Sequence, residues 1–356
     1  METKELLQMV IDRNASDLHL LAKMPPILRI NGELKSLVTV GVFSTEDVEK
    51  FIISVLSEEQ KELLFANREL DFSVSLSLSG SQEVRFRVNA YFQRGSLAGS
   101  FRCVDNKIKT LEELGLPRIL HRFSTLNQGF ILVTGPTGQG KSTTLSAIIN
   151  EINLTRSVHI VTIEDPIEYV YPQGKAIISQ REMKLDTHSF EMALRSVLRE
   201  DPNVVLIGEM RDYETISAAL TVAETGHLVF ATLHTNSAAQ TIDRIVDVFP
   251  SNQQPQIRLQ LSMSLEGIVC QKLLPSLSGS RVPAYEVLMA SSSIRSIIRE
   301  GKTFLIDNVI QTSGDQGMIS FEACLRDLIK AGKISPQVAE EHSIRPEALL
   351  RLLQER

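Results

Sequence analysis

Residues 129–144 read GFILVTGPTGQGKSTT, and the eight residues 135–142 within them fit the phosphate-loop pattern G-x-x-x-x-G-K-[ST]. The apolar run before these eight residues predicts a buried strand, and the residues after them predict a helix. Glycines in such a loop let several backbone N–H groups point at one anion, and the helix N-terminus adds partial positive charge. A glycine-rich turn that binds nothing is the alternative, but the complete pattern in this context favours a nucleoside triphosphate. The residues predicted to bind it are Gly135, Pro136, Thr137, Gly138, Gln139, Gly140, Lys141, Ser142 and Thr143.

Two acidic segments are predicted to complete this site. Lys141 is expected to neutralise the β- and γ-phosphates, and the Ser142 hydroxyl is expected to bind Mg²⁺. Glu164 and Asp165 follow one apolar run and Glu209 follows another, so all three carboxylates are expected at the sheet edge that carries the loop. One acid can hold Mg²⁺ through water while the other orients the attacking water, although Glu164 could also be a surface loop acid. The predicted catalytic acids are Glu209 and Glu164, and the predicted metal ligands are Ser142, Glu164, Asp165 and Glu209.

Histidines and arginines elsewhere in the chain supply further candidates. His227 and His234 flank the apolar run 228–233, and His234, at its carboxyl end, could sense a γ-phosphate. An arginine is often needed to neutralise the charge that develops on a transferring phosphoryl group. Arginines on strands are more often solvated, and they become relevant only if their domain leans over a nucleotide of the same or a neighbouring chain. The candidates near the last strands of the N-terminal part are Arg85, Arg87, Arg94 and Arg102.

The N-terminal part of the chain, residues 1–104, is predicted to be a small α+β domain. Helical spacing of apolar residues predicts helices over 1–13 and near 45–66. The stretches 71–80 and 81–104 alternate apolar with polar residues, and they are joined by Ser-Gly-Ser at 79–81. They therefore predict a hairpin and a further strand on a sheet with one solvated face.

The pattern changes after residue 104. The segment 105–118 is polar and contains Gly115 and Pro117, which predicts a linker. From residue 119 to 356, short apolar runs alternate with helical stretches, which predicts a parallel sheet covered on both faces. The predicted strands are 129–134, 158–163, 203–208 and 227–233, with helices at 142–152, 188–199, 212–224 and 237–248. After residue 250 the chain is predicted to be mostly helical, over 254–274, 293–300, 319–331 and 336–354.

Composition excludes several classes of protein. The 356 residues include 37 Lys+Arg and 43 Asp+Glu, a net charge of −6, which argues against nucleic acid as the main partner. The three cysteines are far apart in the sequence, so a disulfide framework or a structural zinc site is not expected. The N-terminus lacks the pattern of a signal peptide, and no apolar run approaches the ~20 residues of a membrane helix. A cytoplasmic protein without direct membrane insertion is therefore expected.

These motifs together resemble the secretion-type ATPases, and within them the type IV pilus retraction ATPases. The resemblance covers nearly the whole chain. It rests on the segments SDLHL (16–20), PPILRINGEL (25–34), RFRVNAYFQRG (85–95), GPTGQGKSTT (135–144), TIEDPIEYV (162–170), LRSVLREDPNVVLIGEMRD (194–212), AETGHLVFATLHTN (223–236), RIVDVFP (244–250), QKLLP (271–275) and SSIRSIIREGK (292–302). It implies an α/β fold in which a PAS-like N-terminal domain precedes a RecA-like motor domain, assembled as a hexameric ring.

The resemblance also implies roles for individual residues. Residues 162–168 would be the family's aspartate box, and Glu209 would be the catalytic acid of an atypical Walker B segment. The family's histidine box corresponds to His227 and His234, and its arginine fingers, acting at a subunit junction, correspond to Arg87 and Arg102.

The implied function is a motor that hydrolyses ATP with Mg²⁺ to power pilus retraction and twitching motility. The ring would act on a platform protein of the inner membrane, at its cytoplasmic side, and could work with a paralogous retraction ATPase. Ser293 and Ser296 stand where the family's retraction motif, AIRNLIRE, has Ala and Asn. An accessory or regulatory ATP-binding ring subunit with little turnover therefore stays open as the alternative. A guanine-nucleotide switch is disfavoured because no Asn-Lys-x-Asp segment follows the phosphate loop.

Overall fold

The computed structural model describes residues 3–30, 32–77, 83–104 and 107–354. The chain divides into two compact units, Met1–Lys107 and Ile108–Arg356. The predicted linker 105–118 reaches into the second unit, because Leu111 and Leu116 are buried in the core of that unit. Residues 105–106 of this linker, and the predicted hairpin turn at 79–81, lie outside the described residues.

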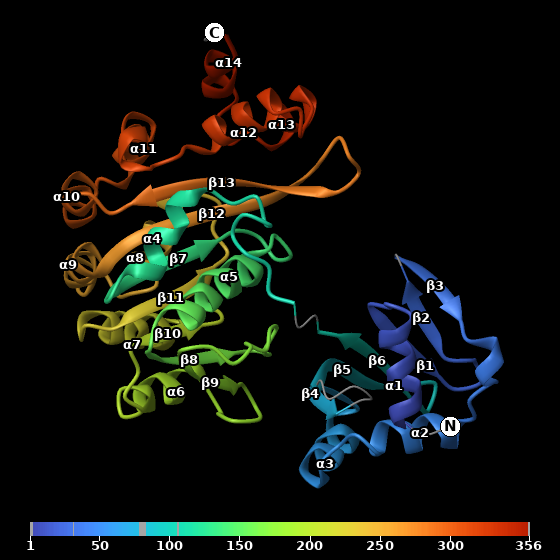
Figure 1. Cartoon of the computed structure of the whole chain (residues 1–356). Coiled ribbons are helices and arrows are strands. Elements are labelled where there is room, and N and C mark those ends of the chain that lie inside the picture. Colours follow the sequence, from blue (N-terminus) through green and yellow to red (C-terminus); the bar gives the residue numbers. More distant parts are fainter. Residues whose placement is uncertain (1–2, 31, 78–82, 105–106, 355–356) are drawn as a thin grey trace. The chain divides into compact units, whose positions relative to one another are not determined.

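The first unit contains a sheet in which each strand pairs antiparallel with its neighbours, in the order β3-β2-β1-β6-β5-β4 (Figure 1). Leu6 and Leu7 of its first helix share a core with Phe86, Val88 and Phe101 of the sheet. These sheet residues alternate with polar ones, which places the polar residues on the opposite face of the sheet. The elements are α1 (Thr3–Asp12), β1 (Asp17–Leu21), β2 (Ile27–Ile30), β3 (Glu33–Ser36), α2 (Thr45–Ile53), α3 (Glu58–Asn67), β4 (Glu69–Ser77), β5 (Glu83–Gln93) and β6 (Ser96–Cys103).

The second unit contains a seven-stranded sheet in the order β13-β12-β7-β11-β10-β8-β9. The strands from β12 to β9 are parallel, and only β13, at the edge, runs antiparallel to its neighbour. Parallel strands covered on both faces are buried throughout, and every residue of β7, β10 and β11 is buried. The strands are β7 (Gly129–Thr134), β8 (His159–Glu164), β9 (Ile177–Glu182), β10 (Val204–Ile207), β11 (Leu228–Leu233), β12 (Leu265–Pro275) and β13 (Arg281–Met289).

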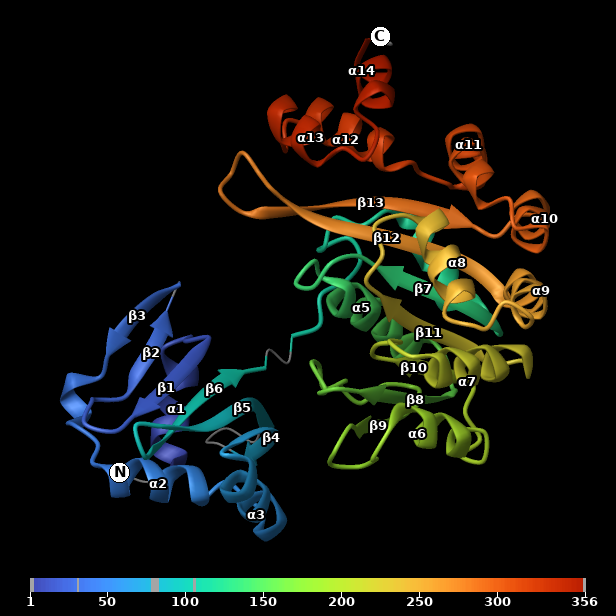
Figure 2. The same cartoon turned by 180° about the vertical axis from the view of Figure 1, so that it is seen from behind.

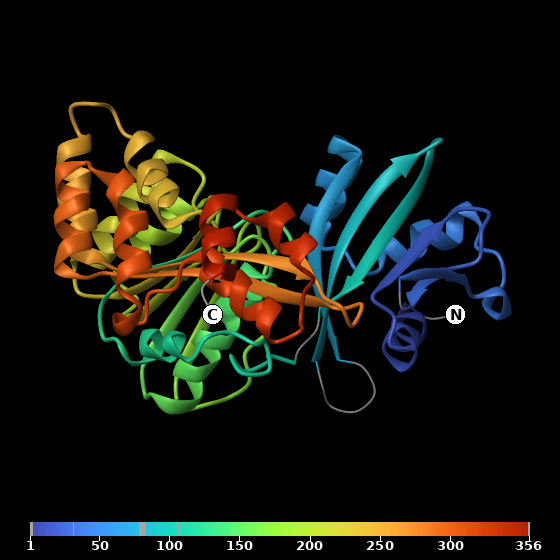
Figure 3. The ribbon, with the colours of Figure 1, turned by 90° about the horizontal axis from the view of Figure 1, so that it is seen from above.

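Helices cover both faces of this sheet, with α4 and α5 on one face and α7 and α8 on the other (Figures 1, 2 and 3). The last helices pack beyond the edge strand β13, where they form a separate apolar cluster with β12 and β13. The helices are α4 (His121–Thr125), α5 (Lys141–Thr155), α6 (Phe190–Val197), α7 (Tyr213–Glu224), α8 (Ala238–Asp247), α9 (Gln254–Ser264), α10 (Ser292–Glu300), α11 (Ile306–Thr312), α12 (Phe321–Lys330), α13 (Pro336–His342) and α14 (Pro346–Gln354).

The predicted helix over 254–274 is wrong in its second half. Only Gln254–Ser264 is helical, and Leu265–Pro275 forms the strand β12 between β7 and β13. An apolar run that is buried on all sides does not reveal its period, so helix and strand cannot be told apart there. The sheet is also mixed rather than wholly parallel as predicted, because Arg281–Met289, in the region predicted to be mostly helical, forms the strand β13 antiparallel to β12.

Two other predicted helices are each divided in the structure. The region 45–66 forms α2 and α3, because the Ser57 side chain accepts a hydrogen bond from the Gln60 N–H and starts a new helix. The region 336–354 forms α13 and α14, and α14 begins at Pro346. Among the described residues, none of the helices combines the length and apolarity that a membrane-spanning segment requires.

Candidate functional site

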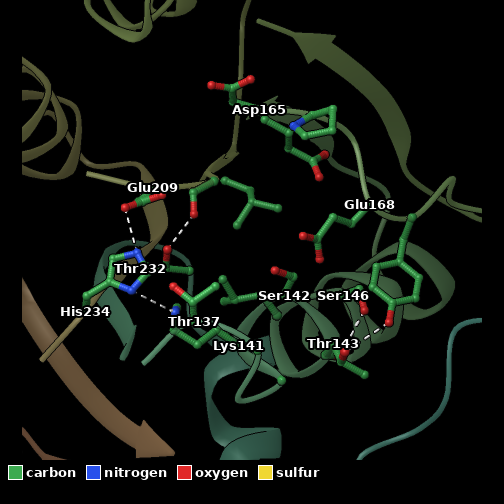
Figure 4. A pocket seen from close by; sticks show the side chains of 18 of the residues that line it. Thr137, Lys141, Ser142, Thr143, Ser146, Asp165, Glu168, Glu209, Thr232 and His234 are labelled. Atoms are coloured by element: carbon green, nitrogen blue, oxygen red, sulfur yellow. Dashed lines mark hydrogen bonds and ion pairs between the residues drawn. The ribbon is translucent and has the colours of Figure 1, made fainter. Parts of the chain in front are cut away.

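A cavity of about 560 Å³ opens at the carboxyl edge of the seven-stranded sheet, beside the phosphate loop (Figure 4). Its size is in the range of cavities that hold small-molecule ligands. Ten of the residues predicted for the site line it: Thr137, Gly138, Gly140, Lys141, Ser142, Thr143, Glu164, Asp165, Glu209 and His234. The structure thus brings the phosphate loop together with the acids that follow β8 and β10 and with the histidine that follows β11.

The phosphate loop is held against β12 by Gln271. The Thr144 hydroxyl donates to Gln271 Oε1 at 2.7 Å, and Gln271 Nε2 donates to the Gln139 carbonyl at 2.8 Å. Gly140 has a φ of +82°, and a Cβ on it would lie 2.8 Å from Gln271 Nε2. The positive φ of this position favours glycine, and a Cβ here would displace the end of the Gln271 side chain. These contacts with Gln271 hold the loop in its shape.

Lys141 begins the helix α5 and is buried to 8% exposure. Its Nζ donates to the carbonyl oxygens of Gly135 and Pro136, at 2.7 and 3.1 Å, and lies 3.4 Å from His234 Nδ1. Burial lowers the pKa of Lys141, and the negative charges of Glu209 and Glu168 act in the opposite direction. The ammonium is thus poised between backbone carbonyls and the cavity, where a phosphate could replace the carbonyls.

Glu209 lies between two side chains that can carry positive charge, Arg211 and His234. Its Oε1 is 2.7 Å from Arg211 Nε and 2.7 Å from His234 Nε2, and Arg211 Nη2 donates to its Oε2 at 2.7 Å. Burial raises the pKa of Glu209, but Arg211 and His234 outweigh burial and hold that pKa below its usual value. Figure 4 shows Glu209, His234 and Lys141 as a continuous series of contacts along one side of the cavity. Glu209 is therefore an ionised carboxylate that faces the phosphate loop.

Glu164 is the more buried acid of the site, at 9% exposure. Burial raises its pKa to about 6, although hydrogen bonds from Thr162 Oγ1, at 2.6 Å, and Gln180 Nε2, at 3.2 Å, oppose this. Asp165 and Glu168, labelled in Figure 4, also line the cavity. The site thus combines one readily ionised acid, Glu209, with one whose charge burial makes costly.

Three of the predicted catalytic side chains do not line this cavity. His227 lies at the amino end of β11, the opposite edge of the sheet, where its Nδ1 is 3.1 Å from both Thr225 Oγ1 and the Val222 carbonyl. This placement does not support a direct contact of His227 with a ligand in the cavity, because the full length of β11 lies between His227 and the carboxyl edge of the sheet. Arg87 and Arg102 belong to the first unit, on β5 and β6, and both are exposed.

Several residues at the cavity were not predicted from the sequence. Arg211 follows Glu209 by two residues, and this closeness in sequence to a candidate acid could have predicted the ion pair between them. Tyr169 OH lies 2.9 Å from Thr143 Oγ1 and lines the cavity, as does Arg281 at the start of β13. Gln271 begins the QKLLP segment of the family resemblance, but its contact with the loop was not predicted, because the segment was expected to be helical.

The donors at the cavity fit Mg²⁺ bound together with phosphates. Among the described residues no group of three or more His, Cys, Asp or Glu side chains is arranged to hold a metal ion by itself. Such a group is not needed, because Mg²⁺ beside phosphates keeps several waters and takes only one or two protein oxygens. All four predicted metal ligands line this cavity and offer hard oxygen donors: the Ser142 hydroxyl and the carboxylates of Glu164, Asp165 and Glu209.

Comparison with known proteins gives consistent matches along the chain. Residues 2–324 match the family of type II/IV secretion system proteins. The type IV pilus retraction ATPase PilT of Pseudomonas aeruginosa is 44% identical over 347 residues, covering 98% of this chain and 99% of the relative. The type IV pilus ATPase PilU of the same organism is 38% identical over 344 residues, covering 96% and 89% of the two chains.

A solved structure extends these matches to the fold. The crystal structure of the pilus retraction motor PilT with bound ADP has a TM-score of 0.91 and 46% identity, and the match covers 99% of each chain. The predicted fold class, an α/β nucleotide-binding unit with a smaller α+β unit before it, is thereby confirmed.

Proposed function

This chain belongs to the family of type II/IV secretion system proteins, and we propose that it is an ATP-hydrolysing motor that powers the retraction of type IV pili. One observation carries the proposal: in a chain similar to PilT over 98% of its length, the phosphate loop and Glu209 line the same cavity. The family match confirms the resemblance inferred from the sequence. The similarity to a motor with bound ADP supports binding of an adenine nucleotide.

The roles we propose within the cavity follow from charge and position. Lys141 and the N–H groups at the start of α5 bind the β- and γ-phosphates. Glu209 orients the attacking water and accepts its proton, since its carboxylate shares the cavity with the phosphate loop and is held in place by Arg211 and His234. His234, 2.7 Å from Glu209 and 3.4 Å from Lys141, responds to the γ-phosphate because it touches both groups. Ser142, Glu164, Asp165 and Glu209 line the cavity and would hold Mg²⁺, which would neutralise phosphate charge when bound.

We further propose that the working form is a homo-hexameric ring. Arg87 and Arg102, which are exposed on the first unit, would then neutralise the phosphates bound by a neighbouring copy. The ring would dock on the pilus platform protein at the cytoplasmic side of the inner membrane, and a paralogous retraction ATPase could join it. No nucleic acid is expected as a partner, given the net charge of −6.

Two substitutions test hydrolysis at this cavity. Lys141→Gln is expected to abolish ATP turnover, because phosphate charge is no longer neutralised, and to leave the circular dichroism spectrum unchanged. Glu209→Gln is expected to retain ATP binding but to lose turnover by roughly 100-fold or more. Turnover by Lys141→Gln equal to that of the unmodified chain would refute the assignment of the cavity.

A second experiment tests the ring. Electron microscopy or light scattering with ATP should show six-fold particles, and a monomer under all conditions would count against a motor. Mixing Arg102→Gln with Glu209→Gln should restore part of the turnover, because composite sites would contain one intact set of residues.

The accessory subunit is the second candidate, and α10 is the observation that favours it. Ser293 and Ser296 replace residues of the family's retraction motif, and Ser296 Oγ donates to Glu300 Oε1 at 3.1 Å within the same helix. The 38% identity with PilU also keeps this candidate open. Turnover of the unmodified chain as low as that of Glu209→Gln would favour the accessory subunit over the motor.

A further inference from the structure

A row of four charged side chains crosses the sheet of the first unit. Arg87 on β5 lies directly opposite Arg102 on β6, Arg102 lies opposite Asp17 on β1, and Asp17 lies opposite Arg29 on β2. Adjacent residues in the strands, such as Phe86 and Phe101, are buried in the core, so the row lies on the other face of the sheet.

The row contains one unfavourable pair and one residue that compensates it. Like charges directly opposite each other on neighbouring strands are destabilising, and Arg87 and Arg102 form such a pair. Asp17 is the single carboxylate of the row, and it lies between Arg102 and Arg29. Its side chain is only 6% exposed, whereas that of Arg102 is 68% exposed. A nearly buried carboxylate thus holds an arginine that reaches into solvent.

The contact between them engages one specific nitrogen. Arg102 Nε donates to Asp17 Oδ1 at 2.9 Å, and Ser16 Oγ donates to Asp17 Oδ2 at 2.7 Å. Arg29 Nε is farther away, 3.8 Å from Asp17 Oδ2. Within the described part of the chain, no hydrogen bond or ion pair engages the two terminal nitrogens of Arg102. Those two nitrogens form the fork with which a guanidinium binds a phosphate by two parallel bonds.

We propose that Asp17 is a positioning residue for Arg102: it fixes the guanidinium through Nε and presents the two terminal nitrogens to the phosphates of a neighbouring copy. This inference rests on the proposed function, in which Arg102 acts across a subunit junction. The SDLHL segment, residues 16–20, then contributes to hydrolysis through its first two residues. Asp17 accepts a hydrogen bond from Arg102, and Ser16 donates a hydrogen bond that orients Asp17.

The charge state of Asp17 suits this role. Burial raises its pKa, but the hydrogen bonds from Ser16 and Arg102 outweigh burial and hold the pKa below its usual value. The carboxylate is therefore ionised at neutral pH. No charged partner of Arg87 is found among the described residues, and the residue across from it on β4 is Ser73. Of Arg87 and Arg102, only Arg102 is fixed by a carboxylate among the described residues. Its side chain therefore loses less conformational freedom when it binds a phosphate.

The test is a double-mutant cycle on ATP turnover. Asp17→Asn keeps the size of the side chain and removes its charge, and it is expected to lower kcat roughly 10- to 100-fold with little change in KM. Arg102→Gln is expected to be at least as impaired, and the double variant Asp17→Asn, Arg102→Gln should be no slower than Arg102→Gln alone. Arg29→Gln is the matched control, because it removes the other cation from Asp17 and keeps the Nε contact. It should stay within about two-fold of the unmodified chain.

A merely structural Asp17 would give different results. In that case Asp17→Asn would slow the Arg102→Gln chain further. Alternatively, Asp17→Asn would lower the melting temperature and reduce the fraction of assembled rings, and the fall in kcat would be explained by that lost fraction. As a positioning residue, Asp17→Asn should regain turnover when mixed with Glu209→Gln, as Arg102→Gln does. If Asp17→Asn does not fold, Ser16→Ala serves instead, since it removes the 2.7 Å contact and should lower kcat by a smaller factor.

The outcomes separate this inference from the proposed function. Full turnover by Arg102→Gln would overturn the role of Arg102 in the proposed function and this inference with it. Impaired turnover by Arg102→Gln together with full turnover by Asp17→Asn, or an additive double variant, would overturn this inference alone.

Discussion

Arg345, between α13 and α14, links these last two helices to β13, α11 and α12 of the same unit, and replacing it with methionine is expected to loosen them. Its Nη2 lies 2.6 Å from Asp307 Oδ1 on α11 and 3.8 Å from Glu286 Oε2 on β13. Its Nη1 lies 3.6 Å from Glu322 Oε2 on α12, and its backbone N–H donates to Glu322 Oε1 at 2.9 Å. One guanidinium thus faces three carboxylates from three different elements.

The expected loss follows from the burial of these carboxylates. Glu286 is 0% exposed and Glu322 is 1% exposed, so both would lose their counter-charge in the interior of the protein. Removing one partner of a buried ion pair costs about 3–5 kcal/mol. We therefore expect Arg345→Met to lower the free energy of unfolding by about 3–5 kcal/mol at pH 8.5.

The loss should depend on pH through Glu286. Burial raises the pKa of Glu286 from 4.5 to about 7, even with Arg345 present. Because the folded pKa is raised, the folded state keeps a proton that the unfolded state has released, and stability falls as pH rises from 4.5 to 7. At about 1.36 kcal/mol per pKa unit, this fall amounts to about 3 kcal/mol. Without Arg345 the pKa rises further, so the cost of Arg345→Met should be smaller at pH 6 than at pH 8.5.

The assay is urea denaturation at pH 6 and pH 8.5, followed by circular dichroism, with hydrogen exchange to locate the loosened helices. Arg351→Met is the matched control, because the Arg351 side chain is 78% exposed and lies 3.9 Å from an exposed Glu347. It should cost no more than about 0.5 kcal/mol. A loss for Arg345→Met that equals the control at pH 8.5, or that does not change with pH, would refute the reasoning.

Two further substitutions probe contacts within the same unit. His121 lies 2.7 Å from Glu112 and 2.8 Å from Glu151; burial lowers its pKa, but these carboxylates outweigh burial and raise the pKa above 6.5. His121→Gln should therefore lower the free energy of unfolding at pH 6 by up to about 1 kcal/mol. It should leave the free energy of unfolding unchanged at pH 8.5, because the contribution of a protonated His121 is lost as pH rises through its folded pKa. Equal losses in thermal denaturation at the two pH values would contradict this. Arg211→Ala should lower kcat for ATP roughly 10-fold, about 1.4 kcal/mol, because Glu209 loses two contacts, and Arg211→Lys should recover part of it. An unchanged kcat in steady-state assays would show that Arg211 does not position Glu209.

The central strands were predictable because each is a continuous apolar run. The predicted strand 129–134 coincides with β7, and the predicted strand 227–233 begins one residue before β11. Strands that are buried on both faces have continuous apolar sequences, and turn residues mark where these sequences end. The strand β12 was missed because Leu265 follows the last residue of α9 directly, without a turn residue to mark the change.

The site was predictable as far as it depends on the ends of strands. Glu209 and His234 follow apolar runs, and the rule that parallel strands share a carboxyl edge brings both to the phosphate loop. His227 precedes the same run, so the same rule puts it at the other edge of the sheet, and only the resemblance to the family's histidine box suggested a role for it. Contacts such as Gln271 with Thr144 depend on which distant strands become neighbours, and no local pattern carries that information.

The strand pair β12–β13 has a mechanical consequence. Gln271 on β12 supports the phosphate loop, while Leu274 on β12 and Val282 and Ala284 on β13 pack against the C-terminal helices. A force applied to those helices would therefore reach the loop through a hydrogen-bonded strand pair, without a flexible joint between them. Coupling between two sites is reciprocal. If a load on the helices changes the affinity of the loop for ATP, then binding of ATP changes the free energy of deforming the strand pair by the same amount. A motor built in this way would sense the tension against which it works.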